Sequence, residues 1–280
     1  MSQKSHPAPL AVDLDRYRIA PGAAVRLGER ATDDTQNADR RAAEKETARL
    51  VEEIDRLQVR LYAEGRQSLL VVLQAMDGAG KDSTIRSVFG PLHPQGVRVA
   101  AFKAPTAPEL AHDFLWRVHQ QVPAKGELVV FNRSHYEDVL IVRVHGWVSA
   151  ETVERRYGHI AAFERLLDDA GTRVVKVMLH ISKAYQLERM RKRLEDPEKH
   201  WKFNPGDLEE RKFWEDYQRA FETAIERTST ERAPWTVVPA EKRWFRDLVV
   251  ARLVVDVLHA MDPQFPPPTY DPATVSLDGA

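Results

Sequence analysis

Residues 71–84, VVLQAMDGAGKDST, have the form of a phosphate-binding loop. An apolar run is followed by Gly78 and Gly80 and then by Lys81, and we expect a helix to begin near Asp82. Backbone N–H groups at a helix N-terminus bind phosphate oxygens, glycine lets the backbone approach them closely, and lysine adds a positive charge. A plain strand-to-helix turn is the alternative, since such strings occur by chance. The strand before the loop and the lysine within it favour phosphate binding.

The loop departs from the usual pattern G-x-x-x-x-G-K-[ST] at two positions. Ala75 stands where the first glycine is usual, and Asp82 follows the lysine. The hydroxyl groups come later, at Ser83 and Thr84. The pattern alone therefore leaves open whether the loop binds a nucleotide or another phosphate compound.

Asp77 lies inside this loop, where its carboxylate would repel phosphate unless a cation lay between them. Magnesium commonly binds one or two protein carboxylates together with phosphate oxygens. Asp77 is therefore a candidate metal ligand. The alternative is an Asx turn that stabilises the loop.

A second polar cluster follows the apolar run of residues 127–131, ELVVF. Its members are Asn132, Arg133, Ser134, His135, Glu137 and Asp138. If the run is a strand of a parallel sheet, it brings them to the carboxyl edge, where such sheets bind ligands. Many P-loop enzymes have a carboxylate at that edge which assists magnesium binding. In this sequence the strand ends at Asn132, and the next acidic residue is Glu137. A surface loop of mixed charge is the alternative.

A third, basic cluster lies within residues 186–207. Arg189 and Arg193 are one helical turn apart and share a helix face, and Lys199 and Lys202 follow in a segment marked by proline. In a phosphoryl-transfer enzyme such a segment can close as a lid over the reacting group. Taken alone, it is more typical of a solvated helix face.

Strands and helices alternate along the chain in a way that positions these clusters. Apolar runs typical of buried strands occur at residues 68–74, 97–102, 127–131, 173–179 and 235–238. Helical patterns occur at 85–89, 108–122, 150–170, 183–194 and 245–261, and another is expected after Asp207 as its cap. The alternation predicts an α/β protein with a parallel sheet covered by helices on both faces.

Composition excludes several classes of function. The formal net charge of the 280 residues is −1, so the whole molecule does not attract nucleic acid. The absence of cysteine excludes disulfides, thiol catalysis and thiolate zinc sites. No H-E-x-x-H or G-x-S-x-G motif indicates a zinc protease or a serine hydrolase. Because no signal peptide and no membrane-spanning run is visible, we expect a cytoplasmic protein without a membrane partner.

Three segments are expected along the chain. Residues 1–35 mix proline, glycine and polar residues without a period, which predicts a flexible N-terminal arm. Residues 36–262 are expected to form a single P-loop kinase domain, and an amphipathic helix at residues 42–61 is expected to lead into its core. Residues 263–280 are rich in proline and are expected to be a C-terminal tail.

Taken together, four motifs resemble the polyphosphate kinase 2 family. They are LQAMDGAGKDST, FKAPTAPELAHDFLWR, FNRSHYEDVLIVRVH and DPEKHWKFNPGDLEER, in this order and at these separations. The likeness runs from about Leu50 to Asp262, and four linked motifs are far more specific than one loop. The altered phosphate-binding loop is the form that this family uses, so Ala75 and Asp82 agree with its pattern.

The resemblance implies a three-layer α/β/α P-loop kinase fold with a helical lid at about residues 185–215. The reaction would reversibly move the terminal phosphoryl group of inorganic polyphosphate to a nucleotide, with Mg²⁺ as cofactor and Mn²⁺ as a substitute. The implied catalytic residues are Asp77, Lys81, Arg133, Glu137, Arg189 and Arg193. The implied phosphate-binding residues are Gly78, Ala79, Gly80, Lys81, Asp82, Ser83, Thr84, Lys103, Arg133, Arg189, Arg193, Lys199 and Lys202. Asp77 and Glu137 would bind the metal.

Nucleotide binding is implied for Asn132, Glu137 and Asp138. Asn132 and Glu137 resemble the subgroup that accepts both AMP and ADP, and we expect adenine nucleotides, with guanine nucleotides left open. The family resemblance also suggests a homodimer or a homotetramer.

Two other functions remain as alternatives. A nucleoside monophosphate kinase would share the fold and the loop but use ATP as donor. A non-catalytic P-loop protein would bind nucleotide tightly without turnover. The presence of Lys81, Asp77 and Arg133 favours an active enzyme.

Overall fold

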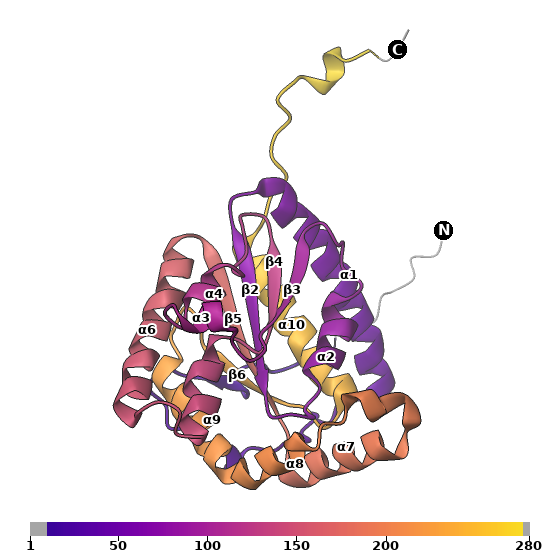
Figure 1. The fold of residues 1–280 in the computed structure, drawn as a ribbon. Coiled ribbons are helices and arrows are strands. Elements are labelled where there is room, and N and C mark those ends of the chain that lie inside the picture. The colour runs from indigo at the N-terminus through magenta and orange to yellow at the C-terminus, as the bar shows by residue number, and fades with distance from the viewer. Residues whose placement is uncertain (1–9, 277–280) are drawn as a thin grey trace.

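The computed structural model describes residues 10–276, which form a six-stranded sheet between layers of helices (Figure 1). The strand order is β1-β6-β5-β2-β4-β3. The strands are β1 (Arg18–Ile19), β2 (Ser68–Ala75), β3 (Val97–Ala101), β4 (Leu128–Asn132), β5 (Thr172–His180) and β6 (Trp235–Pro239). Strands β2 to β6 pair in parallel, and β1 joins the edge of β6 in the antiparallel direction. The predicted parallel sheet is confirmed, with one short antiparallel edge strand in addition.

Helices cover both faces of this sheet. The longer ones are α1 (Arg40–Glu64), α6 (Ala150–Asp169), α7 (Lys183–Glu195), α9 (Trp214–Thr228) and α10 (Arg243–Met261). The short ones are α2 (Lys81–Thr84), α3 (Ala107–Leu110), α4 (Trp116–His119), α5 (Ile141–Val144) and α8 (Gly206–Glu210). In Figure 1, α1 and α10 lie on one side of the sheet, α6 and α9 on the other, and α7 and α8 below the strands. The predicted three-layer arrangement is thereby confirmed. None of the described helices is long and apolar enough to cross a lipid bilayer.

Local capping explains where two of these helices begin and where one of them ends. The Asp39 carboxylate accepts a hydrogen bond from the Ala42 N–H at the start of α1, and Gly65 ends that helix with a φ of 60°. Ser182 caps α7 by accepting from the Tyr185 N–H. Side-chain acceptors at a helix start satisfy donors that the helix itself leaves free, and glycine adopts the left-handed conformation without strain. The start of α7 fixes where its arginines lie.

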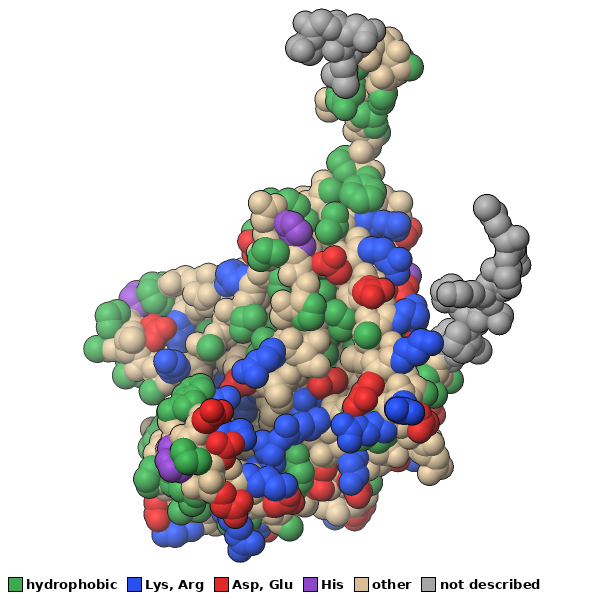
Figure 2. All heavy atoms as spheres, turned by 90° about the vertical axis from the view of Figure 1, so that its right-hand side faces the viewer, with side chains coloured by type: hydrophobic (Ala, Val, Ile, Leu, Met, Phe, Trp, Pro, Cys, Tyr) green, Lys and Arg blue, Asp and Glu red, His purple; other side chains and the backbone are tan. Residues whose placement is uncertain are grey.

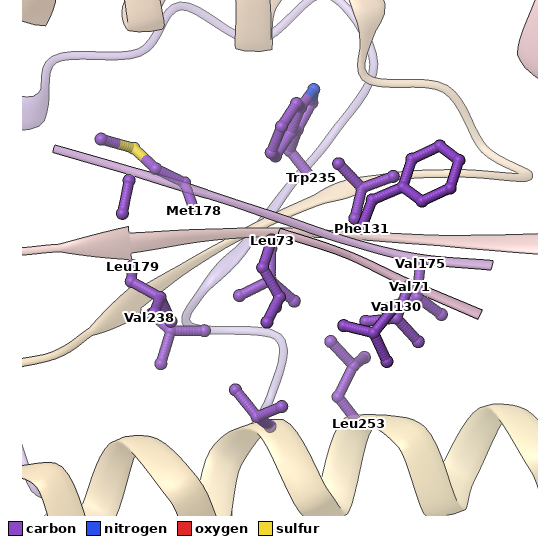
Figure 3. Close-up of a cluster of buried hydrophobic side chains, with 14 of the residues drawn as sticks. Val71, Leu73, Val130, Phe131, Val175, Met178, Leu179, Trp235, Val238 and Leu253 are labelled. Carbon is purple, nitrogen blue, oxygen red and sulfur yellow. The ribbon is translucent and has the colours of Figure 1, made fainter. Parts of the chain in front are cut away.

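The sheet is buried on both faces, which holds the strand ends in place. Figure 3 shows Val71 and Val130 pointing toward Leu253 of α10, while Trp235 and Phe131 lie on the opposite face. The side chains of Val71, Val130 and Phe131 are fully buried. Each such burial stabilises the fold by roughly 1.5–3 kcal/mol. The continuous apolar runs of the sequence therefore reflect strands covered from both sides.

The expected flexible arm is wrong for residues 10–35. Tyr17, Ile19 and Leu27 are buried in the core, and β1 pairs with β6. The backbone N–H groups of Val25 and Leu27 also donate to carboxylates of α9 at 2.7 Å. These apolar residues are too irregularly spaced to predict an element, yet each buries its side chain. Residues 1–9 lie outside the described part of the chain.

The single helix expected at residues 108–122 is also wrong. The chain forms α3 and α4 there, with a turn between them. The Asp113 side chain accepts from the Leu115 N–H at 2.9 Å, and the Asp113 carbonyl accepts from the Trp116 N–H. An aspartate that bonds its own backbone two residues on favours a turn over a continuous helix.

Candidate active site

The loop between β2 and α2 has the backbone that its glycines predict. Gly78 and Gly80 have φ values of 89° and 103°, a region that side chains strongly disfavour. A Cβ atom at Gly80 would lie only 2.2 Å from Nη1 of Arg246. The Lys81 ammonium donates to the Ala75 carbonyl at 2.9 Å, which holds it across the loop. The backbone conformation therefore favours glycine at both positions, and at Gly80 the lack of space favours it as well.

Opposite charges surround Asp77 in this loop. Its Oδ1 accepts from the Arg133 guanidinium at 2.8 Å and lies 3.9 Å from the Lys81 ammonium. Burial by itself would raise the pKa of Asp77, but the charges of Lys81 and Arg133 outweigh it and hold the pKa below its usual value. Asp77 is consequently a carboxylate at neutral pH, as a metal ligand must be.

Arg133 holds an unusual backbone conformation directly after β4. Its φ of 62° is in the left-handed region, which costs a residue with a Cβ about 1 kcal/mol or more. The conformation turns the guanidinium toward two carboxylates, because Nη2 lies 2.8 Å from Asp77 and Nη1 lies 3.9 Å from Glu137. Burial raises the pKa of Glu137, and the charges of Arg133 and Lys81 oppose that shift.

A cavity of about 580 Å³ opens at the loop, and we call it the phosphate pocket. It brings together the predicted residues Asp77, Gly78, Ala79, Gly80, Lys81, Asp82, Ser83, Lys103, Asn132, Arg133, Arg189, Arg193, Lys199 and Lys202. Thr84 is fully buried and does not line it. Within residues 10–276, ten of the lining residues are Lys or Arg and two are Asp. Such an excess of positive charge fits a ligand with many negative charges.

Three basic residues of the pocket were not found from the sequence, namely Arg86, Arg243 and Arg246. Arg246 is almost fully buried, and its Nη1 donates to the carbonyl of Ala79 at 3.3 Å. Arg243 and Arg246 are three residues apart at the start of α10, so they share a helix face. Their spacing was visible, but the apolar residues around them indicated only a core helix.

A second cavity of about 270 Å³ adjoins the first, and we call it the acceptor pocket. Asp77 and Arg133 line both cavities, and Glu137 lines only the acceptor pocket. The walls also contain Leu140, Ile141, Tyr217 and Phe221, together with Asn204, Asp207 and Glu210 from the lid segment. This mixture of apolar, aromatic and polar groups is typical of a site for an organic ligand.

The three predicted nucleotide-binding residues lie apart. Glu137 faces the acceptor pocket, whereas Asn132 lines the phosphate pocket and donates to the Asp82 carboxylate at 2.8 Å. Asp138 lines neither cavity, since its carboxylate oxygens lie 3.7 Å from Arg117 and 3.6 Å from Arg156. Arg117 in turn donates to the carbonyl of Lys103 at 2.9 Å. Asp138 therefore supports the pocket wall from behind, in place of the expected nucleotide contact.

The predicted lid segment contacts the loop directly. The Gln186 amide of α7 donates to the Asp77 carbonyl at 2.9 Å. Arg193 lies 3.5 Å from Asp207, which pairs with it instead of capping a helix as expected, because α8 begins after Pro205. Burial and the charges of Arg243 and Arg193 lower the pKa of Arg189. Several cations are thus held close together with few carboxylates to offset them.

A mostly parallel α/β sheet, a glycine-rich loop after its first long strand and a helix that brings arginines to that loop define a P-loop phosphotransferase. Residues 37–266 match the family model described as polyphosphate kinase 2 (PPK2). The chain belongs to the polyphosphate kinase 2 family.

Individual relatives agree with this assignment. The chain is 52% identical over 257 residues to the AMP/ADP-polyphosphate phosphotransferase of Meiothermus ruber. The match covers 91% of this chain and 96% of that protein. It is 39% identical over 273 residues to the ADP-polyphosphate phosphotransferase of Rhodopseudomonas palustris, with 93% and 94% covered. The crystal structure of polyphosphate kinase 2 from Arthrobacter aurescens TC1 superposes with a TM-score of 0.90 at 44% identity, covering 94% of this chain and 96% of that chain.

Proposed function

We propose that this protein moves the terminal phosphoryl group of inorganic polyphosphate reversibly to ADP and to AMP. The observation that carries the proposal is that Asp77 and Arg133 line both the cation-rich phosphate pocket and the acceptor pocket beside it. Two substrates bound in these cavities would meet at those two residues. Relatives named for AMP/ADP and ADP phosphotransfer support the choice of acceptors.

The two cavities suit the two substrates differently. Polyphosphate carries a negative charge on every unit, which matches the many Lys and Arg side chains of the phosphate pocket. A nucleotide has an apolar base, which matches Leu140, Ile141, Tyr217 and Phe221 in the acceptor pocket. We therefore assign the donor to the first cavity and the acceptor to the second.

The transfer needs alignment and charge neutralisation more than covalent help. A terminal phosphate oxygen of the nucleotide attacks the terminal phosphorus of polyphosphate. The bond from that phosphorus to the bridging oxygen breaks, and the shortened chain keeps the electron pair. The attacking oxygen is already ionised, so no strong general base is required. Lys81, Arg133, Arg189 and Arg193 stabilise the charge that gathers on the transferred group.

Asp77 and Glu137 fit a magnesium ion held together with substrate oxygens. Asp77 is ionised and lies where the two cavities join, and Glu137 lies on the other side of Arg133. Magnesium commonly takes only one or two protein carboxylates and fills its other positions with phosphate oxygens and water. Bound there, Mg²⁺, or Mn²⁺ in its place, would supply positive charge to the phosphates of both substrates.

Asn132 and Glu137 resemble the subgroup that accepts both AMP and ADP, and on that ground we propose that this protein accepts both nucleotides. Relatives named for GDP and for NDP leave the guanine base open. A homodimer or homotetramer stays a prediction, which light scattering on the purified protein would test.

The testing experiment supplies purified protein with Mg²⁺, long-chain polyphosphate and either ADP or AMP, and measures ATP and ADP formed. We expect ATP from ADP, and ADP and then ATP from AMP. The same reactions without polyphosphate but with ATP and AMP test the nucleoside monophosphate kinase alternative. If phosphoryl transfer occurs only in the reactions with ATP and AMP, polyphosphate is not the donor and the proposal is refuted. Tight nucleotide binding without turnover in any reaction would favour a non-catalytic P-loop protein.

A further inference from the structure

We propose that His145 is a positioning residue of the acceptor pocket, where it holds the carboxylate of Glu210 away from the bound nucleotide. His145 directly follows α5 and lines neither the acceptor pocket nor the phosphate pocket. Glu210 ends α8 and lines the acceptor pocket. His145 therefore acts on the nucleotide only through Glu210. The inference rests on the proposed function, since it concerns the cavity assigned to the nucleotide.

The acceptor pocket contains more carboxylates than cations. Of the described residues that line it, two are arginines and four are acidic, namely Asp77, Glu137, Asp207 and Glu210. The shortage of cations is local, because Figure 2 shows Lys and Arg side chains gathered over the lower half of one face of the molecule. A nucleotide brings further negative charge into this pocket. Each carboxylate there consequently weakens nucleotide binding unless a partner offsets its charge.

Glu210 is the one of these four carboxylates without a lysine or arginine partner within residues 10–276, since the others lie close to Arg133 or Arg193. Its partners are His145 and Tyr217. Nε2 of His145 lies 3.0 Å from both carboxylate oxygens, and the Tyr217 hydroxyl donates to Oε2 at 2.7 Å. Burial, and then the hydrogen bond to Glu210, raise the pKa of Tyr217, so its hydroxyl keeps the proton that it donates. His145 is thus the only one of the two partners that contacts both oxygens.

The backbone that carries His145 is fixed by the turn that ends α5. Gly146 has a φ of 63°, which glycine adopts without strain. Its N–H donates to the Arg143 carbonyl at 3.2 Å, and the Trp147 N–H donates to the Val142 carbonyl at 2.9 Å. These two bonds form a Schellman motif, a common way to end a helix. The position of the imidazole is therefore set by the sequence around it.

Two aromatic rings hold the imidazole between the domain core and the lid segment. The ring stacks on Trp147, with centroids 5.1 Å apart and 19° between the planes. Phe213 of the lid segment lies 5.0 Å away on the same measure. The side chain of His145 is only 20% exposed as a result of such packing. An imidazole held in this way presents Nε2 to Glu210 in one direction.

Loss of the imidazole would free the carboxylate of Glu210. Its side chain is 36% exposed and would keep only the hydrogen bond from Tyr217. A carboxylate released at the wall of the acceptor pocket repels the phosphates of AMP and ADP. Polyphosphate should be affected less, because Glu210 does not line the phosphate pocket. The expected defect is therefore weaker nucleotide binding with the donor site intact.

The test measures kcat and KM for ADP at saturating polyphosphate, and KM for polyphosphate at saturating ADP, with Mg²⁺ present. His145→Leu removes the donor and should raise KM for ADP about fivefold, the size of one water-screened charge contact. Its kcat and its KM for polyphosphate should stay unchanged. His259→Leu is the matched control, because His259 also pairs with a carboxylate, that of Glu53 at 2.7 Å, and lines none of the cavities. The control should keep the KM for ADP of the unmodified protein.

Three further variants separate positioning from a packing defect. His145→Gln keeps an N–H donor near the position of Nε2 and should restore the KM for ADP. The double variant His145→Leu with Glu210→Gln removes the released charge and should recover most of the loss. Repair by a second substitution at Glu210 is not expected if His145 only fills space. His145→Asn is too short to reach Glu210 and takes the place of His145→Leu if that variant does not fold.

Calorimetric titration of ADP without polyphosphate measures the same effect without turnover. Affinity should fall about fivefold in His145→Leu and return in the double variant. Unchanged affinity and KM in His145→Leu, or a double variant as weak as the single one, would overturn the inference. An equal rise in the KM for polyphosphate would overturn it as well. If the unmodified protein makes no ATP from polyphosphate and ADP, the proposed function fails, whereas the ADP affinities still decide the role of His145.

Discussion

Removing the buried cation Lys176 should destabilise the fold strongly. Its ammonium lies 2.6 Å from the Glu164 carboxylate and 2.6 Å from the carbonyl of Thr228, and the side chains of both ionic partners are buried. In Lys176→Met, the carboxylate keeps only the Tyr136 hydroxyl at 2.7 Å and the His135 ring at 3.3 Å. Breaking one side of a buried pair costs about 3–5 kcal/mol.

The size of that loss can be measured by urea and thermal unfolding. A loss of this size should lower the melting temperature by roughly 10 °C in a chain of this length. The double variant Lys176→Met with Glu164→Gln removes both charges, so it should recover much of the stability. A single variant that loses less than about 1 kcal/mol, or a double variant as unstable as the two single variants summed, would refute the reasoning.

The pH dependence gives an independent check on the same pair. Burial by itself would raise the pKa of Glu164, but the charge of Lys176 outweighs it and lowers the pKa. A lowered folded-state pKa stabilises the protein above the unfolded value, and that stability is lost as the pH falls through the folded value. Without Lys176 the pKa of Glu164 should rise instead. The stability difference between the two proteins should then shrink as the pH falls toward the acid range, and a difference independent of pH would contradict this.

Three further predictions concern the loop and Arg133. Arg133→Gly should be more stable to urea than Arg133→Ala by about 1 kcal/mol, because only glycine adopts a φ of 62° without strain, while both variants lose turnover. Equal stability would show that the backbone there is relaxed. Gly80→Ala should lose about 1–3 kcal/mol of unfolding free energy and most activity, because its Cβ would meet Arg246, whereas Gly22→Ala has no atom within 4 Å of the new Cβ and should lose less. Lys81→Ala and Asp77→Asn should each lower kcat by about a hundredfold or more with an unchanged circular dichroism spectrum, and near-native turnover would contradict their roles.

Much of the fold was predictable because its strands are buried on both faces and read as continuous apolar runs. The run at 68–74 is an example, since its strand extends from Ser68 to Ala75. The N-terminal strand was missed because it is two residues long, and a pattern needs more positions than that. The break between α3 and α4 was missed because it depends on a side-chain bond of Asp113, which competes with helix formation.

The site was predictable where its residues are close in sequence. The loop residues and the arginines of the lid follow motifs, and most of them line the phosphate pocket. Arg246 was not predictable in this way, because it reaches the loop from a helix more than 160 positions later in the chain. The resemblance implied a nucleotide contact for Asp138 as well as for Glu137, but the two side chains of the 3₁₀ segment His135–Val139 have different partners: Asp138 lies near Arg117, and Glu137 lines the acceptor pocket.

The strained conformation of Arg133 is supported by the buried ion pair of Lys176 and Glu164. A left-handed arginine persists only where its neighbours are held firmly. Here the following residue, Ser134, is fully buried and lies 3.1 Å from the Gln74 amide. The next two residues, His135 and Tyr136, belong to the buried network around Glu164. The Tyr136 hydroxyl donates to the Glu164 carboxylate. The buried ion pair of Lys176 and Glu164 thus helps to hold the segment that follows Arg133. It follows that Lys176→Met should lower kcat in the fraction that remains folded, even though Lys176 lines neither the phosphate pocket nor the acceptor pocket.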